Sequence, residues 1–136
     1  MNKFLVDSDV LLNAVLEGGR QEASVEFLDQ HEEYICTTIL NIMEISSVLS
    51  RKYRWKGKDI RDVVSTIERG TDVLIPSETE IIEAYELVYH HFFSAIDAIL
   101  LTLSKGQDQI LITFDLELLN RGSKHTKVNK PEDWID

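Results

Sequence analysis

The most informative stretch of the 136-residue chain is FLVDSDVLLN, which runs from Phe4 to Asn13. It begins with an apolar run that shows no polar alternation, as is typical of a strand buried on both faces of a parallel sheet. Two carboxylates, Asp7 and Asp9, end this run, and apolar residues then return at helical spacing. Open α/β sheets bind ligands at the carboxyl ends of their strands, whereas short polar residues also cap helices. The stretch therefore predicts either a ligand-binding acid or a helix cap.

Short apolar runs alternate with amphipathic helical patterns along the rest of the chain. The predicted strands cover residues 4–6, 34–36, 73–75 and 110–112. This alternation is typical of βαβ units, so we expect an α/β fold with a parallel sheet between helical layers. Because no repeat, linker or low-complexity segment interrupts the pattern, we predict a single domain over residues 1–136.

Composition limits the classes of function. The formal net charge of −10 argues against a broad electrostatic grip on nucleic acid, although bound divalent cations would invert the sign of charge locally. The single cysteine, Cys36, excludes an internal disulfide, and its apolar surroundings predict a buried, inert thiol in a reducing compartment. Neither a signal peptide nor an apolar stretch of membrane-spanning length is visible, so we expect a cytoplasmic protein that does not enter membranes.

The 14 basic residues fall mainly into two groups. The first group is dense and consists of Arg51, Lys52, Arg54, Lys56, Lys58 and Arg61. The second is looser and consists of Arg121, Lys124, Lys127 and Lys130. Charge runs are most often solvated faces, which is the interpretation we favour for the second group. For Arg51, Lys52 and Arg54, contact with an RNA backbone and a solvated surface are both open.

A helix is predicted from about residue 39 to residue 53, with Thr37 and Thr38 as possible capping residues. Its apolar residues cover nearly the whole circumference, so we expect most of this helix to be buried. Glu44 lies in the middle of that apolar surface. A lone carboxylate there costs several kcal/mol unless it is paired, hydrogen-bonded or bound to a metal ion.

Two more acids occupy positions similar to that of Asp7. Asp97 lies in the first turn of the most apolar predicted helix, and Asp115 closely follows the strand at residues 110–112. Each could simply cap or stabilise a helix start. However, the ends of parallel strands and the starts of the following helices share one edge of the sheet. Asp7, Glu44, Asp97 and Asp115 can therefore converge on one cleft.

Four ionised carboxylates in one cleft repel one another, and a divalent cation relieves that repulsion. A ligand set of carboxylate oxygens without His or Cys favours Mg²⁺ or Mn²⁺ over Zn²⁺. Such ions activate water and stabilise the charge that develops on a phosphodiester during in-line hydrolysis. The four acids thus predict a metal-dependent phosphodiesterase site.

The sequence resembles the PIN-domain ribonucleases at four stretches. These are LVDSDVLL (residues 5–12), NIMEI (residues 41–45), DAIL (residues 97–100) and LITFD (residues 111–115), in the family's order and spacing. The resemblance implies a Rossmann-like three-layer α/β/α sandwich with a mostly parallel central sheet. It also implies cleavage of single-stranded RNA that depends on Mg²⁺ or Mn²⁺.

The resemblance assigns roles to individual residues. Asp7, Glu44, Asp97 and Asp115 match the family's acidic positions, as catalytic residues and metal ligands. Thr113 matches the hydroxyl residue that often precedes the last acid by two, and is a supporting residue. Asp9 occupies a position where the family more often has Asn, Ser or Thr, so its supporting role is open.

The compact size resembles the toxin half of VapBC toxin–antitoxin pairs. That branch of the family implies an RNA substrate, a small antitoxin protein as partner, and a homodimer. Two other functions remain open. A phosphohydrolase of the HAD type would use Asp7 as its nucleophile, because the DSDV motif after an apolar strand also fits that family's nucleophile loop. A PIN-like module without catalytic activity would bind RNA or protein instead.

Overall fold

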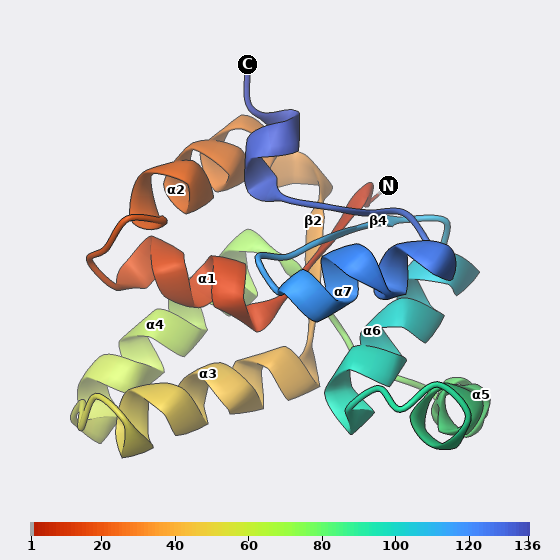
Figure 1. The fold of residues 1–136 in the computed structure, drawn as a ribbon. Helices are drawn as coiled ribbons and strands as arrows, with labels where there is room; N and C mark the ends of the chain where they lie inside the picture. Colours follow the sequence, from red (N-terminus) through yellow and green to blue (C-terminus); the bar gives the residue numbers. More distant parts are fainter. Residues whose placement is uncertain (1) are drawn as a thin grey trace.

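The computed structural model describes residues 2–136 and shows a five-stranded sheet between two layers of helices (Figure 1). The strands are β1 (Phe4–Val6), β2 (Ile35–Thr38), β3 (Asp72–Leu74), β4 (Ile110–Ile112) and β5 (Val128–Asn129). Their order in the sheet is β3-β2-β1-β4-β5, and every pairing is parallel. The predicted α/β/α sandwich is therefore confirmed, and the sheet is parallel throughout.

The helices divide between the two faces of the sheet. One layer holds α1 (Ser8–Val15), α2 (Gln21–Gln30), α3 (Ile39–Arg51) and α4 (Gly57–Gly70). The other holds α5 (Glu78–Tyr89), α6 (Ala95–Gly106) and α7 (Leu116–Asn120). Three single-turn 3-10 helices complete the described chain: η1 (Glu32–Tyr34), η2 (Gly122–Lys124) and η3 (Pro131–Trp134).

Alternation along the central strand builds a core on each face of the sheet. Phe4 and Val6 belong to the core beneath α1 to α4, whereas Leu5 belongs to the core beneath α5 to α7. All three side chains are fully buried, as the absence of polar alternation predicted. Cys36 is also buried, and burial raises the pKa of its thiol to about 11, which agrees with an inert cysteine.

The structure corrects several sequence-based boundaries. The second strand starts at Ile35, because Tyr34 closes the turn η1, and the third starts one residue earlier than predicted, at Asp72. The fifth strand, β5, was not predicted. It has two residues, of which only Val128 is apolar, so the sequence offers no periodicity to detect it.

Helix α3 is less buried than its apolar composition predicted. Met43 is 64% exposed and Ile39 is 36% exposed, so the expectation of burial around most of the circumference was wrong. Ile42, Ile45 and Leu49 form the single buried stripe that packs against the core. The apolar residues on the opposite side remain open to a partner or a ligand.

Within residues 2–136, no helix combines the length and the apolarity that crossing a bilayer requires.

Helix α5 ends in a conformation that its sequence disfavours. The Phe92 N–H donates to the carbonyl of Val88, and the Phe93 N–H donates to the carbonyl of Leu87, both at 3.1 Å. The bond from Phe92 to Val88 is that of the αL motif, in which glycine usually takes the left-handed position. Here Phe92 takes it, with φ of 61°, although 80% of the residue's surface is exposed. A bulky residue therefore bears backbone strain without gaining burial.

We predict that Phe92→Gly raises the free energy of unfolding by about 1 kcal/mol, because glycine adopts positive φ without the Cβ clash. Urea denaturation of the two proteins measures the difference. Phe92→Ala is the matched control, since it removes the aromatic ring but keeps the Cβ. Equal stabilisation by Ala and Gly would show that φ is not the cause.

Candidate active site

The carboxyl ends of β1 and β4 bring distant polar residues together. The two strands are neighbours, and Val6 lies opposite Ile112 in the register. The next residues, Asp7 and Thr113, therefore leave the sheet side by side. The Thr113 Oγ1 donates to Asp7 Oδ2 at 2.8 Å, across 106 positions of sequence. The pairing of these two strands thus fixes the first contact of the site.

Asp7 is buried and held through both carboxylate oxygens. Its Oδ1 accepts from the Ser8 N–H at 2.8 Å and from Asn41 Nδ2 at 3.2 Å, while Oδ2 accepts from Thr113. The residue also occupies the N-cap position of α1. Capping therefore accounts for part of its role, but the Asn41 and Thr113 bonds come from other elements of the fold.

Asp9 belongs to the same group of residues. The sequence alone had left its role open. Its Oδ2 accepts from Thr113 Oγ1 at 3.2 Å and from the Phe114 N–H at 3.1 Å. Its Oδ1 is buried and has no hydrogen-bond partner within the described chain. A buried carboxylate oxygen without a partner is costly, so this atom is a natural ligand for a cation.

The other acids reach the site from separate helix starts. Asp115 is the N-cap of α7, where its Oδ1 accepts from the Leu118 N–H at 3.0 Å, and its own N–H donates to Thr113 Oγ1. Asp97 lies in the first turn of α6. Glu44 is half-buried on α3, and its Oε1 accepts from the Ser8 hydroxyl. Each predicted acid therefore lies at this edge of the sheet.

The pKa values of the acids show that they interact. Burial raises the pKa of Asp7 to about 7, and the charges of Asp9 and Glu44 add to the rise. Burial also raises the pKa of Asp97 to about 7, with further contributions from the charges of Asp7 and Asp115. The pKa of Asp9 rises to about 6, first through burial and then through the charge of Asp115. The five acids therefore form one electrostatic unit.

This donor set suits a hard divalent cation. It consists of carboxylate oxygens, it includes the partnerless Asp9 Oδ1, and its excess negative charge is what a cation would relieve. In the described residues, 2–136, no three His, Cys, Asp or Glu side chains already surround one point in a metal-holding arrangement. Binding would therefore require some of these carboxylates to shift from their present positions.

Comparison with known proteins identifies the family. The family model described as "PIN domain" matches residues 4–124. The chain belongs to the PIN domain family. This agrees with the four stretches that pointed to it in the sequence. No curated protein matches the chain.

Solved structures share the fold of this PIN domain at low sequence identity. VapC20 of Mycobacterium tuberculosis, a toxin that cleaves the sarcin–ricin loop, has 14% identity and a TM-score of 0.77, with 88% of this chain and 95% of that chain covered. A protein of Pyrobaculum aerophilum has 20% identity and a TM-score of 0.73, covering 97% and 91%. A toxin–antitoxin complex of Klebsiella pneumoniae has 18% identity and a TM-score of 0.70, covering 95% and 98%. The PIN domain therefore has the fold of VapC toxins.

Two residues of the site escaped the sequence analysis. Ser8 binds Glu44, and Asn41 binds Asp7 while its Oδ1 accepts from Thr38 Oγ1 at 2.6 Å. Asn41 is fully buried, so it is a polar residue within an apolar helix face, as is Glu44. The same signal that singled out Glu44 could have found Asn41. Ser8 had no comparable signal.

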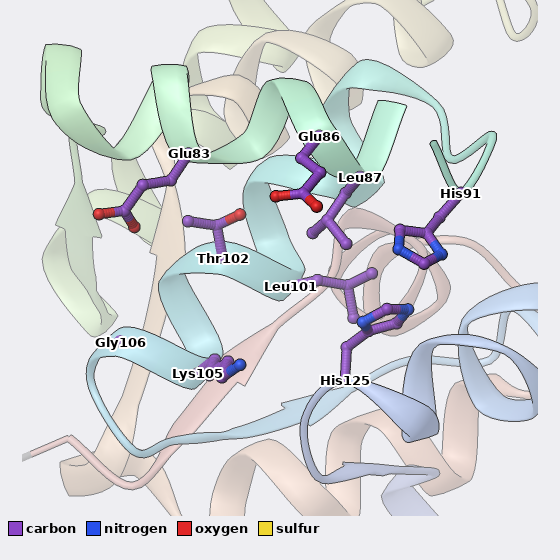
Figure 2. Close-up of a pocket in the computed structure, with 9 residues that line it drawn as sticks. All are labelled: Glu83, Glu86, Leu87, His91, Leu101, Thr102, Lys105, Gly106 and His125. Atoms are coloured by element: carbon purple, nitrogen blue, oxygen red, sulfur yellow. The ribbon is translucent and has the colours of Figure 1, made fainter. Parts of the chain in front are cut away.

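A cavity of the PIN domain lies away from the acids, and two further cavities lie along α3. The first, of about 490 Å³, lies between α5 and α6. Figure 2 shows it with Glu83 and Glu86 on one side and His91 and His125 at one end. None of the five acids of the site lines it. A cavity of about 470 Å³ along α3 does include Glu44. It shares Ser47 and Val48 with a cavity of about 430 Å³ that ends at the basic residues Arg51, Lys52 and Arg54.

We predict that Asp7→Asn stabilises the metal-free protein above neutral pH. The pKa of Asp7 is raised from 3.8 to about 7, so the folded state holds a proton that the unfolded state releases between these values. The stability contributed by that proton is complete below about pH 4 and is lost as pH rises through about 7. Asparagine does not ionise, so it avoids the loss, which amounts to at most about 4 kcal/mol at about 1.4 kcal/mol per pKa unit.

Urea unfolding with a chelator, from about pH 4 to about pH 8, measures this difference. The gap between the variant and the wild type should widen with rising pH. Glu26→Gln, at an exposed position of α2 away from the site, is the control for the removal of a carboxylate. A pH-independent gap for Asp7→Asn would contradict the raised pKa.

Proposed function

We propose that this PIN domain is a metal-dependent endoribonuclease of the cytoplasm that cleaves single-stranded RNA. One observation carries the proposal: five carboxylates lie at the carboxyl edge of a parallel sheet in a family of nucleases, and burial together with neighbouring acids raises the pKa of three of them, Asp7, Asp9 and Asp97. Alone, such a cluster would destabilise the fold, because each ionised acid opposes the ionisation of the others. Binding of Mg²⁺ or Mn²⁺ to Asp7, Asp97 and Asp115 would offset that cost.

A divalent cation bound to this site supplies an activated water and stabilises the charge that builds on the phosphodiester. The residues of the chain hold the groups in place. Thr113 and Asn41 orient the two oxygens of Asp7. Ser8 binds one carboxylate oxygen of Glu44 and leaves the other free to bind the cation or to orient the attacking water. Asp9 extends the negative surface through its partnerless oxygen.

The HAD-type alternative requires Asp7 to attack the substrate as a nucleophile. The structure opposes this role, because both oxygens of Asp7 accept hydrogen bonds and only 6% of the residue is exposed. Membership in the PIN family also favours hydrolysis by water over a covalent intermediate at an aspartate. The other alternative is a PIN-like module without catalytic activity. In such a module, no catalytic function would offset the energetic cost of acids that raise one another's pKa.

The nuclease activity can be tested with purified protein and a labelled single-stranded RNA. We predict cleavage with Mn²⁺ or Mg²⁺, none with a chelator, and a loss of at least about a hundredfold for Asp97→Asn, because one ligand and one negative charge are removed. Glu117→Gln, which changes an exposed carboxylate beside the site, is the matched control and should retain activity. Equal cleavage by wild type and Asp97→Asn would identify a contaminating nuclease and refute the assignment.

We further propose that the protein is the toxin of a VapBC-type pair. A chain of the toxin–antitoxin complex from Klebsiella pneumoniae shares its fold, and the protein exposes apolar side chains that a small antitoxin or a second copy in a homodimer could cover. The exposed set includes Ile82, Tyr85, Tyr89 and Phe92, on or just after α5. Exposed apolar surface of this kind is typical of interaction sites.

Expression in a bacterium tests this role. We predict that induction of the wild type arrests growth and that induction of Asp97→Asn to the same level does not, because arrest would require RNA cleavage. Size-exclusion chromatography with light scattering measures whether the purified protein is a dimer. Growth arrest by both forms would separate toxicity from the nuclease site and contradict the toxin proposal.

A further inference from the structure

One face of α3 connects the acids to the densest basic group. Glu44, Ser47 and Arg51 follow at spacings of three and four residues, so they lie on the same side of the helix. At a rise of about 1.5 Å per residue, Glu44 and Arg51 are about 10 Å apart along the axis. The catalytic end and the cationic end of this face are therefore separated by two helical turns.

Two cavities lie along this face of α3. The cavity that includes Glu44 also contains Met43 and Ile96, and it shares Ser47 and Val48 with the cavity that contains Arg51, Lys52 and Arg54. The two cavities adjoin at Ser47 and Val48. We call the combined surface the α3 groove; Met43 and Glu44 lie at one end of it, and Arg51, Lys52 and Arg54 lie at the other.

The two ends of the α3 groove differ in charge. Arg51, Lys52 and Arg54 are exposed, and within residues 2–136 none of them pairs with a carboxylate. They stand out on a protein of formal charge −10. Tyr53 lies among them and is 44% exposed, with Lys52 Nζ 5.4 Å from the centre of its ring. Interleaved cationic and aromatic side chains are typical of surfaces that bind single-stranded nucleic acid.

We propose that the α3 groove is the path of single-stranded RNA away from the scissile phosphate. This inference rests on the proposed nuclease function and extends it by naming the direction of the strand. The Arg51, Lys52 and Arg54 side chains contact backbone phosphates, and the apolar surface beside Glu44, where Met43 is 64% exposed, contacts base faces. A spacing of about 10 Å corresponds to roughly three nucleotides in a stacked strand, and to fewer in an extended one.

RNA suits both ends of the α3 groove better than a protein segment does. The phosphates of an RNA strand would contact the Arg and Lys side chains at one end. At the other end they would contact a cation bound to the acids. A peptide of acidic residues would match only the basic end, and a basic peptide only the acidic end. Charge complementarity therefore favours a continuous polyanion that binds both.

Binding of a fluorescein-labelled, random-sequence RNA of about 12 nucleotides tests the path. Fluorescence polarisation in Ca²⁺ would compare the wild type with Arg51→Gln/Arg54→Gln over a range of KCl concentrations. We predict that the double variant raises Kd about tenfold and lowers the salt slope by about 1.4, at about 0.7 per phosphate contact of a single strand. Lys105→Gln/Lys124→Gln is the matched control, because it removes the same charge outside the α3 groove. Its Kd should stay within about twofold.

A second pair of variants tests the Glu44 end of the groove. Met43→Glu places a negative charge along the path at an exposed position, and we predict that it weakens RNA binding at least threefold relative to Met43→Gln. Both variants should keep the Tm of the wild type, because Met43 contributes little buried surface.

The outcomes separate this inference from the nuclease proposal. Equal RNA affinity for the wild type and Arg51→Gln/Arg54→Gln, or an equal loss in the control, would overturn the path even if metal-dependent cleavage is observed. Unchanged RNA affinity together with loss of a co-expressed protein partner would instead assign the α3 groove to protein binding. Absence of cleavage by the wild type would refute the nuclease proposal, whereas the binding measurement would still test the path.

Discussion

The Thr113 hydroxyl is the contact on which the site depends. It lies within hydrogen-bonding distance of Asp7 and of Asp9, and it also accepts the N–H of Asp115. A hydroxyl carries one hydrogen, so it cannot serve two carboxylates equally. The negative charge that remains must be met by a proton or by a cation. A single side chain thus links three acids without neutralising the charge of any of them.

The sheet determines where these acids meet. Because β1 and β4 are adjacent and parallel, Asp7 and Thr113 leave the sheet at the same level. Helices α6 and α7 then begin at the same edge and bring Asp97 and Asp115 to it. Asp7 is buried by this arrangement, so its charge cannot be screened by water. The fold therefore concentrates charge at one place, and the exposed ends of the helices leave that place accessible.

The sequence allowed the sheet and the positions of the acids to be predicted, because both follow from local patterns. An apolar run followed by a carboxylate is visible at Asp7 and at Asp115, and a carboxylate in an apolar helix is visible at Glu44. The contact of Asp9 with Phe114 was not predictable, since it joins residues 105 positions apart through a backbone N–H. The exposure of Met43 was not predictable either. Apolar composition shows that a residue can be buried, whereas the packing of neighbouring helices determines which ones are.

The strand order has a consequence for synthesis of the protein. The strand β1 is made first, yet one of its two neighbours in the sheet is β4, which starts at Ile110. Asp7 therefore has no Thr113 to bind until more than a hundred residues have followed it. Contacts of such long sequence separation form late, because loop closure must precede them. A nascent chain on the ribosome would thus lack the assembled group of acids, which would form only after nearly all of these elements had been translated.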